Sequence, residues 1–354
     1  MTDPGNRAIV AVLCSAAFFG ASTPMARSLV GAMDPLWLAG LLYAGSGLGL
    51  SIGLLVRHGG LLGASRRVAP FARADLRWLA AAIGAGGIAA PALFTFGLAR
   101  TSGAAASLLL NLETVFTVAI AWFVFGEHRN ARTVAGMALV VLASAVLGGE
   151  GGGDPRVGAG ALLIALACLA WALDNNLTRK IAGNDAMLIA AAKGLVGGAV
   201  NLGLAAVLAG PAPPLGAALA AGIIGFFGFG VSVALFVVAL RSLGVARASA
   251  YFTTAPFVGV SVAFLLLGER PGFAFWTALP LMAVGVWLHL TERHAHAHVH
   301  GGLAHAHPHR HDMHHPHAHD FAWDGREPHT HFHEHEPLTH VHSHTPDAHH
   351  RHRH

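Results

Sequence analysis

Long apolar stretches separated by short polar segments make up the first 290 residues of the chain. A helix needs about 20 apolar residues to cross the hydrocarbon core of a membrane. Because lipid offers no hydrogen-bond partner to free backbone groups, stretches of this kind predict transmembrane α-helices. The ten predicted spans, of which the fifth is short, are 8–30, 36–56, 78–98, 104–125, 133–148, 159–182, 187–208, 215–240, 248–267 and 273–290.

An internal repeat relates two of these stretches. Residues 98–127 and 239–269 both have an Arg and a Gly early, then small residues, an aromatic centre and a Gly-Glu end. A weaker similarity relates 19–27 (FGASTPMAR) to 171–179 (WALDNNLTR). Each half then has five spans, an odd number, so the halves must be inverted relative to each other, which is typical of carriers. The predicted fold class is an all-α polytopic membrane protein with two inverted five-helix repeats.

The domain organisation follows from the same pattern. Glycines recur at helical spacing in the second span, at Gly45, Gly49 and Gly53, and such faces let helices approach closely in lipid. We expect them to pack against another helix. The predicted segments are a first repeat over 1–148, a glycine-rich linker over 149–158, a second repeat over 159–290 and a disordered tail over 291–354.

Composition and charge agree with a membrane protein. Of 354 residues, 54% are hydrophobic and 11% are charged, whereas a soluble domain carries about 25% charged residues. The arginines lie in short loops rather than in one basic patch, so nothing indicates nucleic-acid binding. With the N-terminus inside, inner loops hold twelve lysines and arginines, and outer loops hold Arg27, Arg100, Arg156 and Arg270. We therefore predict a multi-pass protein of the cytoplasmic (inner) membrane with both termini in the cytoplasm.

Short motifs of small, aromatic and acidic residues lie in these spans. They are Phe19-Gly20-Ala21-Ser22 with Pro24, Leu112-Glu113 with Phe116, Phe125-Gly126-Glu127, Ala255-Pro256-Phe257 and Leu267-Gly268-Glu269-Arg270. Through them the chain resembles the EamA-type branch of the drug/metabolite transporter superfamily, over about residues 8–290. The resemblance implies a ten-span carrier, with a solute range from amino acids to metabolites and drugs. Thr114 stands where a proline is common in the first repeat.

Three ionisable side chains fall within predicted spans, where a charge costs roughly 2.5–3.5 kcal/mol and usually faces a cavity or a partner. Asp174 lies about ten residues before the turn near residue 184, and Lys193 about nine after it. Two antiparallel helices with the same rise per residue place both at similar depth. We predict an ion pair, which either orders the bundle or belongs to a solute or proton site.

Glu113 has no partner nearby in the sequence and is expected near the midplane. A carboxyl group in such a setting is able to carry a proton, so we predict that it faces the transport cavity. The side-chain amides of Asn111 and Asn175 and the indole of Trp171 could bind a solute. They are equally compatible with hydrogen bonds between helices. The candidate cavity residues are Glu113, Asn111, Trp171, Asp174, Asn175 and Lys193.

Gly-Glu pairs end the fourth and ninth stretches, each with an arginine close by. Gly126 with Glu127 and Gly268 with Glu269 are interpreted as interfacial motifs whose charge fixes a loop. A role in transport is the alternative interpretation.

Histidines dominate the tail, which contains 23 of the 26 in the chain. Prolines and a near absence of aliphatic residues argue against a packed core and predict disorder. Alternating His-X-His spacing lets a flexible chain gather several imidazoles around Zn, Ni, Co or Cu ions. The candidate metal ligands are His294, His296, His298, His300, His305, His307, His309, His311, His314, His315, His317, His319, His329, His331, His333 and His335.

The leading hypothesis is a secondary transporter that exports a small metabolite or drug-like solute, with a metal-binding tail that buffers or regulates. The sequence has no GxxxxGK[ST] loop, so we expect neither ATP hydrolysis nor enzymatic activity, and no required cofactor. The alternatives are a divalent-metal (Ni, Co or Zn) efflux carrier and a metal-responsive membrane sensor without transport. Expected partners are the lipid bilayer, a solute and divalent ions at the tail, but no nucleic acid; homodimerisation is left open.

Overall fold

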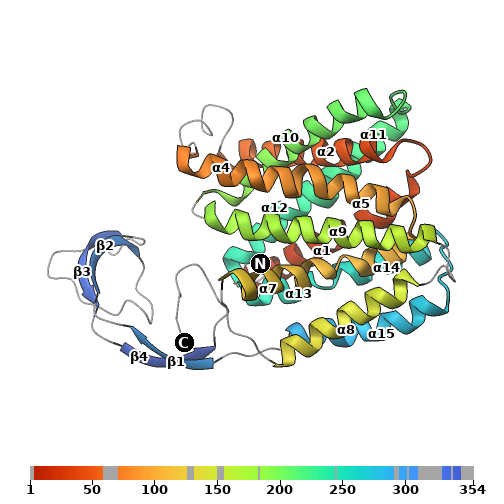
Figure 1. Cartoon of the computed structure of the whole chain (residues 1–354). Helices are drawn as coiled ribbons and strands as arrows, with labels where there is room; N and C mark the ends of the chain where they lie inside the picture. Colours follow the sequence, from red (N-terminus) through yellow and green to blue (C-terminus); the bar gives the residue numbers. More distant parts are fainter. Residues whose placement is uncertain are drawn as a thin grey trace. The chain divides into compact units, whose positions relative to one another are not determined.

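The computed structural model describes residues 4–58, 71–125, 131–149, 155–181, 184–243 and 245–290 of the apolar body, and 295–300, 303–309, 329–335 and 338–343 of the tail. The first half of the body contains α1 (Pro4–Ser28), α2 (Pro35–His58), α4 (Arg73–Ala82), the π-helix η1 (Ile83–Ala89), α5 (Ala90–Leu98), α6 (Gly103–Leu109), α7 (Leu112–Phe125) and α8 (Ala131–Gly148) (Figure 1). The second half contains α9 (Pro155–Thr178), the 3-10 turn η2 (Arg179–Ile181), α10 (Ala186–Leu208), α11 (Leu215–Gly225), the π-helix η3 (Phe226–Val231), α12 (Ser232–Leu243), α13 (Val245–Phe252), α14 (Ala255–Leu265) and α15 (Phe273–Leu290).

Eight helical segments among the described residues are long and apolar enough to cross a membrane. They coincide with the first eight predicted spans. Two further apolar helices, Ala255–Leu265 and Phe273–Leu288, are shorter. The chain is thus a multi-pass membrane protein, whereas the count of ten spans stays a prediction.

Several spans are not uniform α-helices, which the apolar pattern did not indicate. The third and eighth spans each contain a glycine-rich π-helical segment, η1 and η3. The fourth span breaks between α6 and α7, and the ninth breaks between α13 and α14, where Pro256 lies in the first turn of α14. Such irregularities free backbone groups for other partners. They fall at matching places in the two halves.

Helices α2 and α10 lie side by side (Figure 1) and run antiparallel. At their crossing, a Cβ on Gly194 would lie 2.6 Å from the backbone N of Gly47. Farther along α2, a Cβ on Gly53 would lie 3.1 Å from Cε of Met187, at the start of α10. Because the numbering rises along one helix and falls along the other, the pair is antiparallel.

The predicted glycine face of α2 packs mostly against the eighth span. A Cβ on Gly45 would overlap the carbonyl oxygen of Gly222 in α11, and a Cβ on Gly49 would lie 3.0 Å from the ring of Phe226 in η3. The predicted close packing of this face is therefore confirmed.

Helices α8 and α15 form a second antiparallel pair, low in Figure 1. A Cβ on Gly285 would lie 2.8 Å from the carbonyl oxygen of Gly136. One turn away, the guanidinium of Arg132 lies over the ring of Trp287, 5.2 Å from its centroid. The fifth helix of one half therefore packs on the fifth of the other.

All seven residues of α6 are buried, which makes this segment part of the core of the body. Its sequence, Gly-Ala-Ala-Ala-Ser-Leu-Leu, has small side chains over its first turns. These allow α1 and α14 to approach closely. The core is therefore built around the first part of the fourth span.

The described segments of the tail form two antiparallel strand pairs. Strand β1 (Ala295–His300) pairs with β4 (Leu338–Ser343), and β2 (Leu303–His309) pairs with β3 (His329–His335). Alternating His-X-His sequence has the two-residue period of a strand, and the disorder predicted for the tail stays a prediction. Outside the described residues lie the candidate ligands His294, His311, His314, His315, His317 and His319.

Candidate functional site

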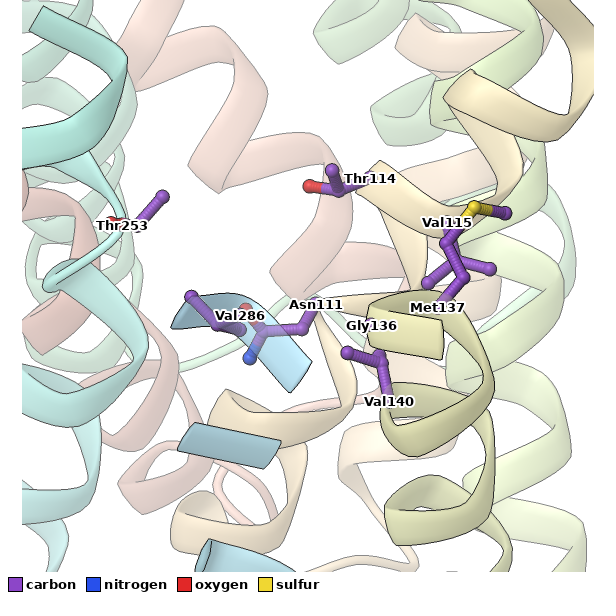
Figure 2. A pocket seen from close by; sticks show the side chains of 8 residues that line it. All are labelled: Asn111, Thr114, Val115, Gly136, Met137, Val140, Thr253 and Val286. Atoms are coloured by element: carbon purple, nitrogen blue, oxygen red, sulfur yellow. The ribbon is translucent and has the colours of Figure 1, made fainter. Parts of the chain in front are cut away.

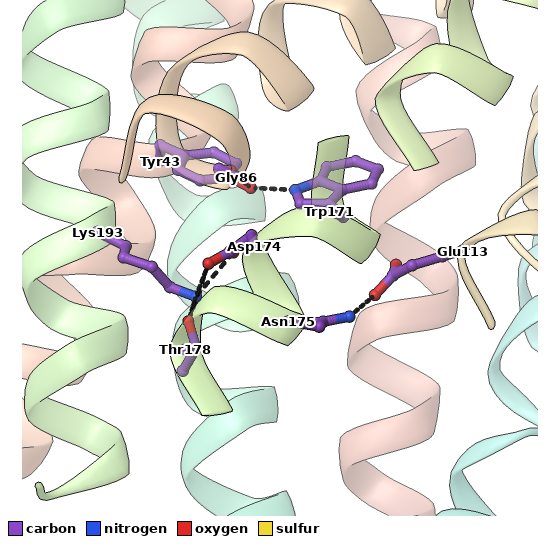
Figure 3. Close-up of polar contacts among 8 residues, drawn as sticks. All are labelled: Tyr43, Gly86, Glu113, Trp171, Asp174, Asn175, Thr178 and Lys193. Carbon is purple, nitrogen blue, oxygen red and sulfur yellow. Dashed lines mark hydrogen bonds and ion pairs between the residues drawn. The ribbon is translucent and has the colours of Figure 1, made fainter. Parts of the chain in front are cut away.

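Asp174 of α9 and Lys193 of α10 form an ion pair within the membrane-spanning body, which confirms the predicted pair. Lys193 Nζ lies 2.9 Å from Oδ1 and 2.8 Å from Oδ2 of the carboxylate (Figure 3). Thr178 Oγ1 also donates to Oδ1, at 3.0 Å. Only 6% of the Asp174 side chain and 18% of the Lys193 side chain are exposed. Each charge thus offsets the desolvation of the other.

Gly86 in η1 makes room for the carboxylate, because a Cβ at this position would overlap Asp174. The carbonyl oxygen of Gly86 accepts a hydrogen bond from the Tyr43 hydroxyl at 2.9 Å. The same hydroxyl accepts one from Trp171 Nε1 at 2.8 Å (Figure 3). A polar chain thereby joins α9 to α2 and η1.

Two further backbone carbonyls of the π-helical segment have a partner in α10. Asn201, which is fully buried, donates through Nδ2 to the carbonyl oxygens of Gly87 and Ile88, at 3.3 Å each. A π-helix leaves carbonyls without their usual helical donor. Side chains from α2 and α10 supply donors here, which fixes η1 beside the ion pair.

Glu113, at the start of α7, has a partner that its sequence neighbourhood did not reveal. Asn175 Nδ2 donates to Glu113 Oε1 at 2.8 Å. Asn175 is exposed and Glu113 is half-buried. The adjacent residues Asp174 and Asn175 point toward different helices, α10 and α7 respectively (Figure 3). Helix α9 therefore carries both polar groups, and the partner of Glu113 comes from a distant part of the sequence.

Asn111 lies apart from these groups, at the break between α6 and α7. Its Nδ2 donates to the carbonyl of Leu108 at 2.9 Å. It lines a pocket between the fourth, fifth, ninth and tenth apolar segments (Figure 2), and the space that water can occupy there is about 30 Å³. This volume holds one or two water molecules. The lining residues are Asn111, Thr114, Val115, Gly136, Met137, Val140, Thr253 and Val286.

Aromatic rings from both halves adjoin the polar groups. The rings of Phe94 and Trp171 lie 5.6 Å apart, those of Tyr43 and Phe229 6.2 Å, and those of Phe229 and Phe19 5.6 Å. Apolar rings with a few convergent polar groups are typical of small-molecule sites. The arrangement brings apolar and polar groups of this kind together around α9.

The structure thus gathers five of the six candidate cavity residues around α9 and leaves Asn111 at a separate pocket. Sequence reasoning missed Tyr43, Gly86 and Asn201. Tyr43 carried a usable signal, since it is one of two tyrosines in the chain and lies in an apolar span. Gly86 carried none, because the chain has 44 glycines.

Glu269 contacts a helix of the other half. It follows Gly268, whose φ of +65° is the left-handed conformation that glycine tolerates. Glu269 Oε1 accepts from the backbone N–H of Gly103 at 2.8 Å, and Oε2 from that of Ala104 at 2.9 Å. Gly126 and Glu127 lie outside the described residues.

Asp185 joins the two halves at the opposite end of the body. Its Oδ1 accepts from the backbone N–H of Met187 at 2.8 Å and of Leu188 at 3.3 Å, and its Oδ2 lies 2.8 Å from Arg57 Nη1. Burial by itself raises the pKa of Asp185. The hydrogen bond from Met187, the charge of Arg57 and the remaining hydrogen bonds outweigh burial, and they hold the pKa of Asp185 below its ordinary value.

Replacing Asp185 with Ala is expected to destabilise the purified protein by about 1 kcal/mol at pH 7, as for other helix caps. A lowered pKa in the folded state contributes stability that is complete above the unfolded pKa, near 3.9, and is lost as pH falls through the lower folded value. The measurement is thermal unfolding of wild type and Asp185→Ala in detergent from about pH 7 to about pH 3. The difference in stability between wild type and Asp185→Ala should shrink as the pH falls. Arg57→Gln should destabilise the protein less than Asp185→Ala does. A difference that does not change with pH contradicts the assignment.

Comparison with known proteins agrees with this architecture. The sequence model of the EamA-like transporter family matches residues 6–149 and again residues 158–291. The chain is similar to an uncharacterized transporter of Methanothermobacter thermautotrophicus, at 27% identity over 274 residues, which are 73% of this chain and 79% of that relative. A protein of known crystal structure matches with a TM-score of 0.59 and 20% identity, over 80% of this chain and 98% of that one, which shows a shared fold alone. With the family model matched over most of its length, the chain belongs to the EamA-like transporter family.

Proposed function

We propose that this membrane transporter is a secondary carrier of the cytoplasmic membrane, with two inverted five-span halves that alternate access to a site around α9. The supporting observation is the antiparallel packing of corresponding helices, α2 on α10 and α8 on α15. Inverted halves of this kind rock about a site near the bilayer midplane. Both termini then lie in the cytoplasm, as the loop arginines predict.

Matching contacts recur when the halves are exchanged. A Cβ on Gly86 of η1 would overlap Asp174 of α9, and a Cβ on Gly228 of η3 would overlap Ser22 of α1. Since η1 and η3 lie in the third and eighth spans, and α1 and α9 are the first and sixth, the two contacts are equivalent. They support a common ancestry of fold for the halves.

A second matching contact shows where the halves differ. A Cβ on Gly87 would lie 3.1 Å from the carbonyl oxygen of Lys193, and a Cβ on Gly230 would lie 3.0 Å from that of Ser46. Serines in the first half therefore occupy the places of the ion pair in the second. The two charges of the ion pair belong to the second half alone, so at these matched places a solute would meet an ionic side and a neutral side.

The proposed cargo is a small metabolite or drug-like solute, and the proposed direction is export. The rings of Trp171, Phe94 and Phe229 supply apolar surface next to the polar groups on α9. Coupling is assigned to a proton gradient through Glu113. Its carboxyl group is half-buried and hydrogen-bonded to Asn175 across the two halves, so a change in its charge alters a contact between them.

The tail is proposed to buffer or sense divalent metal ions. In β1 and β4, the pairing register aligns His296 with His342 and His298 with His340. In β2 and β3 the register likewise aligns His305, His307 and His309 with His333, His331 and His329. Histidines brought to neighbouring places are suited to Zn, Ni, Co or Cu.

The same histidines favour a second candidate function, a divalent-metal efflux carrier whose tail collects the ion. Within the described parts of the chain, no group of three or more His, Cys, Asp or Glu is arranged to hold a metal ion. An organic cargo therefore remains the preferred proposal. A metal-responsive sensor without transport is the third candidate, and it gives no reason for matched contacts in two halves.

Uptake into proteoliposomes tests these proposals, with full-length protein and a form ending at residue 292. The probes are Ni²⁺, Co²⁺ and Zn²⁺, a panel of labelled amino acids and sugars, and a fluorescent organic cation. We expect both forms to move an organic probe and neither to move metal. Metal uptake by the full-length form alone would establish the efflux carrier, and no uptake of any probe would favour the sensor.

Glu113→Gln is expected to abolish the response of that uptake to an imposed pH gradient while solute exchange continues. Asp75→Asn is the matched control, because Asp75 is a carboxylate near the start of α4 that accepts from Asn184, beyond the end of α9, at 3.0 Å. Its response to the pH gradient should equal that of wild type. An unchanged response in Glu113→Gln would remove Glu113 from the coupling role.

A further inference from the structure

Glu269 uses both carboxylate oxygens on backbone groups of the opposite half. The chain turns back after α14, with Glu269 N–H donating to the carbonyl of Ala263 at 3.0 Å. This turn aims the side chain at Gly103 and Ala104, whose N–H groups donate at 2.8 and 2.9 Å. Hydrogen bonds to an ionised acceptor are about twice as strong as neutral ones. The contact is therefore a strong one between the second half and the first.

Gly103 is closely packed between Glu269 and α1, so a larger residue would not fit there. A Cβ there would lie 3.0 Å from Glu269 Oε1 and 3.0 Å from Cα of Pro24 in α1. The preceding turn is held to α1 by Arg27, whose Nε donates to the carbonyl of Thr101 at 2.9 Å. The segment that receives Glu269 is thus already fixed to the first half.

Close backbone packing continues inward from this contact. A Cβ on Gly259 of α14 would lie 2.5 Å from Ser107 Oγ of α6 and 2.8 Å from the carbonyl of Gly20 in α1. Ser107 itself is only 1% exposed. Helices α1, α6 and α14 therefore seal one end of the body, and by the loop arginines this is the outer end.

We propose that Glu269 is a latch that holds the outer end of the carrier closed. This inference rests on the proposed function, in which the halves move against each other in each cycle. When the outer end opens, α14 must part from α6, and the two hydrogen bonds of Glu269 must break. The two hydrogen bonds of Glu269 then determine the fraction of carriers whose outer end is open. This fraction does not depend on which solute is carried.

Thiol labelling from outside tests the latch in full-length protein. Ser107→Cys is the reporter, in a background with Cys14→Ser and Cys168→Ala, and the reagent is a membrane-impermeant maleimide. Glu269→Ala is expected to raise the labelling rate at position 107 about tenfold, because loss of two charge-assisted hydrogen bonds favours the open state. Glu269→Gln keeps one acceptor and should give a smaller rise.

Asp34→Ala is the matched control. Asp34 also accepts a backbone N–H at this end of the body, from Leu36 at 2.9 Å, but within its own half. Its labelling rate should equal that of the parent. Equal labelling rates in the parent and Glu269→Ala, or an equal rise in Asp34→Ala, would overturn the latch.

The labelling and transport measurements fail separately. If labelling rises in Glu269→Ala while no probe is transported, the latch stands and the carrier proposal fails. If a probe is transported while labelling is unchanged, the carrier proposal stands and the latch fails.

Discussion

Replacing Lys193 with Met is expected to destabilise the protein by about 3–5 kcal/mol, since it leaves the Asp174 carboxylate buried without a cation. Only 6% of that side chain is exposed, and Gly86 packs directly against it, so little water reaches the carboxylate. Thr178 retains its hydrogen bond and offsets only part of the loss. The measurement is the midpoint of thermal unfolding in detergent, followed by tryptophan fluorescence.

The double variant Asp174→Asn with Lys193→Met tests whether the two residues are coupled, by comparison with Lys193→Met alone. Removing both charges together is expected to restore most of the stability, because replacing a whole buried pair is often nearly neutral. Exchanging the two charges is a weaker test. The space beside Gly86 fits a short carboxylate and not a lysine side chain, so an exchanged pair should recover only partly. If the double variant is as unstable as Lys193→Met, the two residues are not coupled.

Replacing Gly194 with Ala is expected to destabilise the bundle by about 1–3 kcal/mol, the usual cost of overpacking. The added Cβ would lie 2.6 Å from the backbone N and 2.7 Å from Cα of Gly47, and 3.0 Å from the carbonyl oxygen of Tyr43. Backbone cannot give way as a flexible side chain does, so α2 and α10 must separate. Displacement of Tyr43 then weakens its hydrogen bond with Trp171.

Gly203→Ala is the control on the same helix, since a Cβ at Gly203 meets nothing within 4 Å. It should be neutral or slightly stabilising, because glycine within a helix is worse than alanine by roughly 0.5–1 kcal/mol. Unfolding midpoints in detergent compare the two variants. Equal effects at both positions would show that helix propensity, and not the α2–α10 contact, determines the result.

The amino-acid pattern determined those features that depend on distance along a helix. Run lengths located the eight long apolar helices, and glycine spacing identified the close face of α2. The depth of Asp174 and Lys193 followed from a constant rise per residue, and the structure confirms their pair. The inverted arrangement of the halves and the role of the cavity stay predictions.

Rotation about each helix axis and the choice of lateral neighbours were decided by tertiary packing alone. Asn175 lies next to Asp174 in the chain yet reaches Glu113 on a different helix. Likewise, Glu269 reaches Gly103, 166 residues away, because the turn after α14 points toward α6. Periodicity gives no information about either contact, since an apolar span tolerates any rotation until neighbours with small residues select one. The π-helical segment η1 has the same origin, because Tyr43 and Asn201 of other helices donate hydrogen bonds to its free carbonyls.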